Sequence, residues 1–303
     1  VSIALCTYNG AAYIKQQLDS ITDQTYTNLE IIICDDASVD DTIKIIEEYR
    51  AKEPRIILYR NDTNIGYNKN FEKAFSLCSG DYIAISDQDD VWEKEKIELM
   101  MKNWPAGSSF VYSLSGNFMN DDFAERTEAP NVRYTAIDDL HKLVFNSPVH
   151  GHACMFKKEL LQLCVPFPYD IYYDWWMSMH AAAAGTIGCI PITLTWHRDH
   201  SQNSSRTLMT IKDREERDKQ LRKQMIYFIE TFCHSVQVAA KQRDSLLRYA
   251  GILKEMDGKR FHADMFLYVL KNRKLIFHYK KNKAFAFLSH LKHARRMGYR
   301  GLL

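Results

Sequence analysis

The first hundred residues alternate short β-branched runs with segments of helical periodicity, and this alternation constrains the fold more than any other feature. Four apolar stretches have the length of strands, at residues 2–6, 29–34, 56–59 and 82–85. The segments between them carry apolar residues at helical spacing. Strands that alternate with helices form mainly parallel sheets. The sequence therefore predicts an α/β fold with a mainly parallel central sheet.

The helix boundaries carry further signals. The second helix is expected to begin with a capping box, in which Ser38 is followed by Asp41. The third helix is expected over residues 68–78, and Gly80 is expected to end it.

Beyond residue 103 the pattern becomes a mixture of strands and helices, and then helices alone. Strands or helices are predicted at residues 110–114, 138–145, 153–156 and 174–184. We therefore predict an α/β domain over residues 1–205, followed by a helical C-terminal region over residues 206–303.

Composition sets limits on location and partners. No run of about 18 uncharged apolar residues is present and the first residues lack a signal-peptide pattern, so we expect a cytoplasmic protein. The seven cysteines form no Cys-x-x-Cys pair, which favours reduced, buried thiols. No acidic residue follows Asp264, whereas ten lysines and arginines do. Such a polycation fits nucleic-acid phosphates or an anionic membrane surface.

Polar residues gather after every predicted strand of the first hundred residues. They are Thr7, Tyr8 and Asn9 after the first strand, Asp35 and Asp36 after the second, Arg60 after the third and Asp87 after the fourth. The carboxyl ends of parallel strands share one edge of the sheet, and ligands bind at that edge in open α/β sheets. We therefore expect these side chains to converge on one crevice.

The fourth strand is followed by Asp87-Gln88-Asp89-Asp90. Three carboxylates within four residues repel one another and any phosphate unless a cation lies among them. Mn²⁺ or Mg²⁺ binds carboxylate and phosphate oxygens and neutralises charge that builds on a diphosphate leaving group. We predict such a metal site here, and the alternative is a solvated acidic turn before the next helix.

These motifs together resemble family 2 inverting glycosyltransferases, which have the GT-A fold, over about residues 1–204. Cys-Thr-Tyr-Asn-Gly at residues 6–10 is similar to the opening loop of that family, with Cys6 at a frequent proline position. The resemblance implies that Asp36 contacts a pyrimidine ring. It also implies that Asp89, helped by Asp87, holds the metal ion on the diphosphate of a nucleotide sugar.

Arg60 with Asn64, Gly66 and Asn70 resembles the stretch that closes over the donor in that family. The resemblance implies nucleotide-sugar contacts for these four residues. Taken alone, Asn64-Ile65-Gly66 could be an ordinary turn.

The sequence Tyr172-Tyr173-Asp174-Trp175-Trp176 places one carboxylate at the start of a predicted helix. Single displacement at an anomeric carbon needs one base that accepts the proton of the acceptor hydroxyl. By resemblance Asp174 is that base, and its alternative role is helix N-cap. Trp175 and Trp176 are expected to stack on acceptor sugar rings, although one of two adjacent helix residues normally faces the core.

The segment from Trp196 to Asn203 contains Arg198-Asp199-His200, which resembles the Arg-x-His segment of bacterial surface-polysaccharide rhamnosyltransferases. The resemblance implies that Arg198 offsets diphosphate charge and that His200 lies near the metal or the phosphates. It also favours dTDP-rhamnose as donor, ahead of UDP-sugars. The chain departs from that subgroup at Tyr173, where histidine is frequent, and at Ser201, where glycine is frequent.

His150-Gly151-His152 invites a metal interpretation, but no third ligand stands nearby in the sequence. We favour a backbone and acceptor-pocket role for this segment. By resemblance, Gly151 lies in the loop under the donor sugar.

Competing functions fit less well. Residues 7–16 contain one glycine and no arginine, unlike the opening loop of a sugar-phosphate nucleotidyltransferase, and they lack the Gly-x-Gly-x-x-Gly of a Rossmann oxidoreductase. Many enzymes of the resembled kind act on lipid-linked acceptors, so we expect the basic tail to bind the inner face of the cell membrane and no nucleic acid. A noncatalytic nucleotide-sugar-binding or membrane-associated scaffold protein is the remaining alternative.

Overall fold

The structure is a computed structural model that describes residues 1–119, 122–128, 134–200, 211, 213–236, 238–256, 260–279 and 286–302. The chain forms two compact units. The first comprises Val1–Asn131 and Val149–His200, and the second comprises Val132–Pro148 and Ser201–Leu303.

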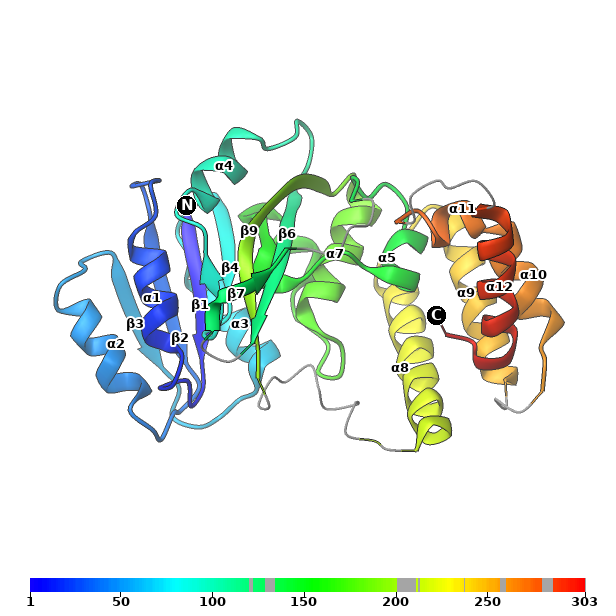
Figure 1. Cartoon of the computed structure of the whole chain (residues 1–303), viewed down its shortest axis with the longest axis horizontal. Helices are drawn as coiled ribbons and strands as arrows, with labels where there is room; N and C mark the ends of the chain where they lie inside the picture. Colours follow the sequence, from blue (N-terminus) through cyan, green and yellow to red (C-terminus); the bar gives the residue numbers. More distant parts are fainter. Residues whose placement is uncertain are drawn as a thin grey trace. The chain divides into compact units, whose positions relative to one another are not determined.

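The first half of the sheet in the first unit is parallel, as the sequence predicts (Figure 1). Its strands are β1 (Ser2–Thr7), β2 (Glu30–Asp35), β3 (Ile56–Arg60) and β4 (Tyr82–Ser86), in the order β3-β2-β1-β4. The register pairs Thr7 with Asp35 and Asp35 with Arg60. These three residues therefore stand side by side at the carboxyl edge of the sheet.

The second half of the sheet mixes both strand directions. It contains β5 (Val91–Trp92), β6 (Phe110–Met119), β7 (Asp122–Thr127), β8 (Cys154–Lys157) and β9 (Gly188–Asp199). The order continues from β4 through β8, β6 and β9 to β5, and β7 pairs with β6. β6 is parallel to β9, whereas β8 is antiparallel to both of its neighbours.

Helices cover the sheet and complete the core of the first unit. They are α1 (Ile14–Thr22), α2 (Thr42–Arg50), α3 (Tyr67–Leu77), α4 (Lys96–Lys102), α6 (Leu161–Cys164) and α7 (Tyr173–Ala184), with the short 3₁₀ turns η1 (Gly151–Ala153) and η2 (Lys158–Leu160). Ile14, Leu18 and Ile21 of α1 are fully buried in one cluster with strand residues. Burial of each such side chain contributes roughly 1.5–3 kcal/mol, which fixes the helix on the sheet.

Two predicted helix signals, at Ser38 and Gly80, are wrong, because each residue makes contacts outside the helix. The hydroxyl of Ser38 bonds Asp35 at 2.5 Å, and α2 begins only at Thr42, so Ser38 forms no capping box. Gly80 does not end α3, whose C-cap is Cys78. A Cβ on Gly80 would lie 2.8 Å from Oγ of Ser2, so glycine is needed for close approach to β1.

The second unit consists of helices. They are α5 (His141–Asn146), α8 (Arg214–Ser235), α9 (Ala240–Glu255), α10 (Ala263–Lys271), α11 (Arg273–Ile276) and α12 (Ala286–Arg300). The sequence pattern predicts α5 in the first domain, but the structure places this helix in the second unit. The ring centroid of Phe145 in α5 lies 4.5 Å from that of Tyr249 in α9. The apolar face of α5 therefore completes the helical core. The domain boundary near residue 205 lies outside the described residues and stays a prediction.

The cysteines and the helix lengths bear on two expectations from composition. All seven cysteines are free, and only Cys189 is partly exposed. Of the helices in the described ranges, none has both the length and the apolarity needed to span a bilayer.

Candidate active site

The loops after β1 and β2 hold each other in place. The hydroxyl of Thr7 donates to Asp35 at 2.8 Å. The backbone amide of Asn9 donates to the Ser38 hydroxyl, and the Asn9 side chain accepts from the amide of Val39, each at 2.9 Å. Asn9 adopts a φ of 48°, a left-handed conformation that asparagine tolerates better than most residues. Thr7, Asn9 and Asp35 therefore brace the two loops at the carboxyl edge of the sheet.

Tyr8 connects this edge to the acidic loop. Its amide donates to Oε1 of Gln88 at 2.9 Å, and its carbonyl accepts from Nε2 of Gln88 at 3.1 Å. The Tyr8 side chain itself is about half exposed. The aromatic ring is therefore accessible at this edge of the sheet, while the backbone of Tyr8 fixes Gln88.

Asp36 closes the loop that follows β3. Its buried carboxylate accepts from Nδ2 of Asn61 and from the amides of Ile65 and Gly66, at 2.8, 2.8 and 2.9 Å. Gly66 has a φ of 83°, which explains the glycine at this position. The side chain of Asn64 also accepts from the Gly66 amide, at 3.0 Å. A buried carboxylate thus draws the predicted donor-closing stretch toward β2.

Asn70 and Arg60 differ in their availability. Nδ2 of Asn70 donates to the carbonyl of Cys34 at 2.8 Å, and its Oδ1 accepts from Asn61 at 3.0 Å. Both amide atoms of this buried side chain bond within the fold, and the contact of Asn70 with the donor stays a prediction. Arg60 donates to the carbonyl of Ser38 and keeps 57% of its side chain exposed. Arg60 therefore remains available to an anionic ligand.

The acidic loop brings three carboxylates together at different depths. The side chains of Asp87, Asp89 and Asp90 are 37%, 17% and 0% exposed. Partial burial, and then the charges of Asp90 and Asp89, raise the pKa of Asp87 well above its usual value. This crowding of negative charge is the environment that a divalent cation relieves.

His200 lies against the acidic loop. Its Nε2 is 2.8 Å from Oδ2 of Asp89. Its ring packs on Tyr13, with centroids 4.5 Å apart. Asp89 and His200 thus present two potential ligand atoms side by side.

The side chain of Arg198 is buried next to the acidic loop. It is fully buried, its Nε donates to the carbonyl of Asp89 at 2.8 Å, and its guanidinium lies 4.5 Å from the ring centre of Phe118. A second nitrogen donates to Gln16. The guanidinium therefore positions the Asp89 backbone, and the offsetting of diphosphate charge by Arg198 stays a prediction.

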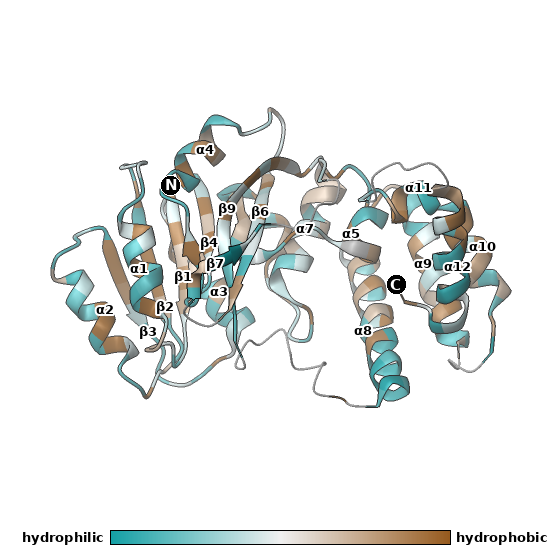
Figure 2. Ribbon diagram, viewed as in Figure 1, coloured by the Kyte–Doolittle hydropathy of each residue, from teal (hydrophilic) through white to brown (hydrophobic). Residues whose placement is uncertain are grey.

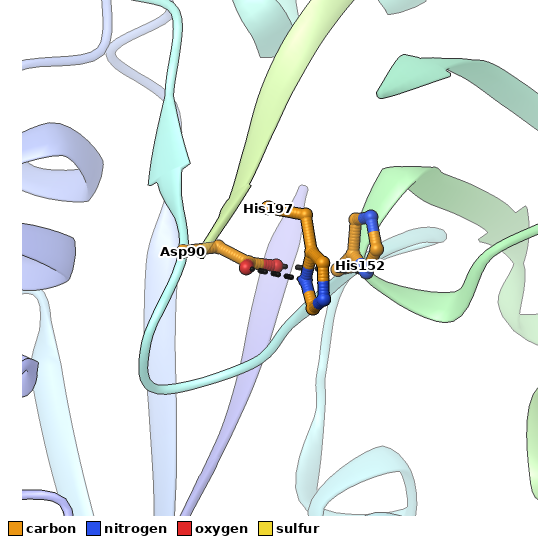
Figure 3. A group of neighbouring side chains, drawn as sticks. All are labelled: Asp90, His152 and His197. Atoms are coloured by element: carbon orange, nitrogen blue, oxygen red, sulfur yellow. Dashed lines mark hydrogen bonds and ion pairs between the residues drawn. The ribbon is translucent and has the colours of Figure 1, made fainter. Parts of the chain in front are cut away.

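A second cluster, which the sequence did not predict, consists of Asp90, His152 and His197 (Figure 3). Nδ1 of His197 donates to Oδ1 of Asp90 at 3.0 Å, and Nδ1 of His152 is 3.6 Å from Oδ2 of the same carboxylate. Burial by itself would lower the pKa of His197, but the hydrogen bond to Asp90 and the nearby carboxylates raise it to about 9. The signal in the sequence was His152, which we set aside because its partners are distant along the chain.

Asp174 lies in the first turn of α7 beside η1. Its carboxylate accepts from the amides of Gly151 and Trp175, at 3.0 and 2.8 Å. Burial raises the pKa of Asp174, and the two amides partly oppose that shift. The N-cap of α7 is Tyr172, so Asp174 does not have the capping role considered above. A Cβ on Gly151 would lie 2.6 Å from the Tyr173 hydroxyl, which explains the glycine.

The two tryptophans after Asp174 face different environments. Trp176 is 3% exposed, and its indole donates to the carbonyl of Cys164 at 2.8 Å. It belongs to the core, which corrects its assignment to the acceptor site. Trp175 is partly exposed, so it is the one of the pair that keeps accessible surface.

Comparison with known proteins identifies the family. The model of Glycosyl transferase family 2 matches residues 2–164. The dTDP-rhamnosyl transferase RfbG of Shigella flexneri is 42% identical over 99 residues, which cover 31% of this chain and 34% of that protein. The chain spans 59% of the length of the Mycobacterium bovis and Mycobacterium tuberculosis proteins that it matches with 28% identity, over 66% of its own length.

Two solved structures share the fold. TarS 1–349 of S. aureus, in complex with UDP-GlcNAc, gives a TM-score of 0.64 at 16% identity and covers 99% of this chain and 89% of that chain. The mannosyltransferase PcManGT of Pyrobaculum calidifontis, in complex with GDP-Man and Mn²⁺, gives a TM-score of 0.59 at 16% identity. The match covers 99% of this chain and 80% of that chain. With the family model matching more than half of its residues, the chain belongs to glycosyl transferase family 2, and it has the GT-A fold.

Proposed function

We propose that this glycosyltransferase moves a sugar from a nucleoside diphosphate to a hydroxyl of a glycan or lipid-linked acceptor, with inversion at the anomeric carbon. The observation that carries the proposal is the carboxylate of Asp174, which accepts from the amides of Gly151 and Trp175 at 3.0 and 2.8 Å, in a chain of this family. Burial raises the pKa of Asp174, which suits a carboxylate that accepts a proton.

Asp174 is proposed as the base that accepts the proton of the acceptor hydroxyl. The amides of Gly151 and Trp175 orient its carboxylate. Trp175 is proposed to pack against the acceptor sugar, because it lies next to Asp174 and retains accessible surface.

The site fits a divalent cation, Mn²⁺ or Mg²⁺. Carboxylate crowding at Asp87 leaves negative charge to be neutralised, and the 2.8 Å approach of Asp89 and His200 places an oxygen and a nitrogen side by side. Asp89, Asp87 and His200 would hold the ion, which when bound neutralises charge on the diphosphate. The Mn²⁺ in PcManGT supports this assignment.

The nucleoside is proposed to bind the loop over Thr7, Tyr8 and Asn9, together with Asp36 and Arg60. A carboxylate offers about four acceptor positions, and Asp36 uses three of them within the fold. The fourth suits the imide N–H of a pyrimidine. We favour dTDP-rhamnose because of the similarity to RfbG, and UDP-sugars are the alternative because TarS was solved with UDP-GlcNAc.

A donor panel tests the binding part of this proposal. We expect calorimetry with dTDP-rhamnose, UDP-glucose and UDP-GlcNAc, each with and without Mn²⁺, to give metal-dependent binding of one pyrimidine nucleotide sugar. Binding to none of them would favour the alternative of a noncatalytic scaffold protein.

Replacing Asp174 tests the catalytic part. With the bound donor and a panel of glycan acceptors, we expect Asp174→Asn to lower turnover by about 10²–10⁴-fold with nearly unchanged donor affinity, because a general base contributes that much. Asp170→Asn, an exposed carboxylate four residues earlier, is the matched control. Transfer by Asp174→Asn at the original rate would show that the base assignment is wrong.

We also propose that the helical unit binds an anionic membrane, at the inner face of the cell membrane. Leu288, Lys292, Arg295 and Tyr299 are all exposed on one stripe of α12, and the opposite side buries Met297. Figure 2 shows the mixture of hydrophobic and hydrophilic residues along this helix. A helix with cationic and apolar side chains on one face suits a bilayer surface. The lysines at 280, 281 and 283 lie outside the described residues.

Charge reversal tests the membrane proposal. We expect Lys292→Glu with Arg295→Glu to weaken binding to phosphatidylserine vesicles at least about tenfold, and binding by the original protein to fall with salt. Lys241→Glu with Arg243→Glu in α9 makes the same charge change on another exposed face and should have a smaller effect. Equal loss in both double variants would indicate a response to net charge alone.

A further inference from the structure

We propose that Asp90, His152 and His197 form a second cation site, suited to Zn²⁺ and separate from the Asp89–His200 pair. The three residues come from the loop before β5, from η1 and from β9, and their side chains meet in the first unit (Figure 3). An ion bound here would cross-link the three segments that carry the acidic loop, the Gly151 turn and the strand leading to His200.

The potential ligand atoms of the three residues lie close together. All three residues offer atoms that lie within 4.8 Å of one another. Oδ1 of Asp90 is 3.0 Å from Nδ1 of His197, and Oδ2 of Asp90 is 3.6 Å from Nδ1 of His152. In a tetrahedral zinc site with bonds of about 2.0–2.1 Å, neighbouring ligand atoms are about 3.4 Å apart. The rings of His152 and His197 are stacked with centroids 4.9 Å apart, so binding of one ion by both would require the rings to rotate.

A buried oxygen provides a second, independent observation. Asp90 is fully buried, and its Oδ2 accepts no hydrogen bond from the described part of the chain. Leaving a carboxylate oxygen buried without a partner is costly, and a metal ion removes that cost.

The outer nitrogen of His152 is held in the way expected of a metal ligand. Its Nε2 is 2.8 Å from Oγ of Ser115 in β6, which fixes the ring orientation and directs Nδ1 toward Asp90. Two imidazoles with a carboxylate favour a transition metal, whereas the carboxylates and phosphates of the donor site favour Mg²⁺ or Mn²⁺. The chemistry of the two sites therefore differs.

The whole protein is first stripped of metal with a chelator. Zinc is then added, and no nucleotide is present. We expect one tightly bound zinc per chain, measured by elemental analysis after gel filtration. We expect the same stoichiometry in His200→Gln, which changes only the donor site, and none in His152→Gln or His197→Gln. Ser115→Ala should retain zinc with affinity lowered about 10–100-fold. Circular dichroism and melting curves of each variant verify the fold.

Cobalt provides a readout on the unaltered chain. Replacing zinc by Co²⁺ should give visible absorption bands typical of four-coordinate cobalt with nitrogen ligands. Absence of stoichiometric zinc binding in the unaltered protein would overturn the proposal and leave an ion pair between Asp90 and His197. Zinc that is lost in His200→Gln but retained in His197→Gln would also overturn it. Neither result bears on donor binding, because no nucleotide is present.

Discussion

Two acidic pairs stand at the same edge of the sheet, Asp35 with Asp36 after β2 and Asp87 with Asp89 after β4. The first pair receives hydrogen bonds from hydroxyls, backbone amides and an asparagine side chain. The second pair shares its loop with a third carboxylate, and burial and like charge raise the pKa of Asp87 well above its usual value. The supply of hydrogen-bond donors therefore separates a pair whose charge is largely met within the fold from a pair whose charge the proposed cation would relieve.

The largest expected effect belongs to the second pair. Asp89→Asn should weaken Mn²⁺-dependent binding of the nucleotide sugar by about 10²–10³-fold, because it removes a charged ligand atom from the diphosphate site. The free energy of unfolding should change little, since Asp89 is still 17% exposed. Calorimetry with and without Mn²⁺ checks the affinity. If the variant bound the donor equally well under both conditions and as tightly as the original, Asp89 would not be a ligand.

A smaller effect, on stability, is expected for the first pair. Asp35 accepts from the Thr7 hydroxyl and from the amide of Ser38, both at 2.8 Å, in a fully buried position. Asp35→Asn places an NH₂ group against one of these donors and should lower the free energy of unfolding by about 1–3 kcal/mol. Urea denaturation measures this change. Asp62→Asn, in an exposed position of the following loop, should stay within about 0.5 kcal/mol.

The smallest effect, with the opposite sign, is expected for Asp87→Asn. Because the folded-state pKa of Asp87 is raised, ionising this carboxyl costs stability once the pH exceeds the unfolded-state pKa of about 3.9. The variant should therefore be more stable at pH 7, by at most about 1 kcal/mol given the partial exposure of the side chain. Near pH 3 the two proteins should melt alike. A variant less stable than the original at pH 7 would mean that Asp87, like Asp35, is held by donors.

The same carboxylate should make donor binding depend on pH. A metal ligand must be deprotonated, so a raised pKa at Asp87 makes protons compete with the metal at a higher pH than for an ordinary carboxyl. We expect Mn²⁺-dependent donor affinity to decline on acidification earlier than the ordinary pKa of aspartate would predict. Titrations at a series of pH values check this. A flat profile down to about pH 4 would contradict it.

Sequence patterns identified the features that depend on neighbours along the chain. The strands of the first half, their common edge and the acidic loop follow from β-branched runs and from residues placed directly after them. The approach of His200 to Asp89 also agrees with the motif that the sequence carries. Periodicity reports which residues can be buried together, and it does so locally.

Burial depth and partner identity were decided only by the tertiary structure. Arg198 and Trp176 lie in motifs with functional resemblance, yet both are buried and bond backbone carbonyls. His152 gains Asp90 as a neighbour from 62 residues earlier and His197 from 45 residues later. Sequence spacing does not encode such approaches, because they depend on the strand order β4-β8-β6-β9 and on how each side chain is directed once the sheet has formed.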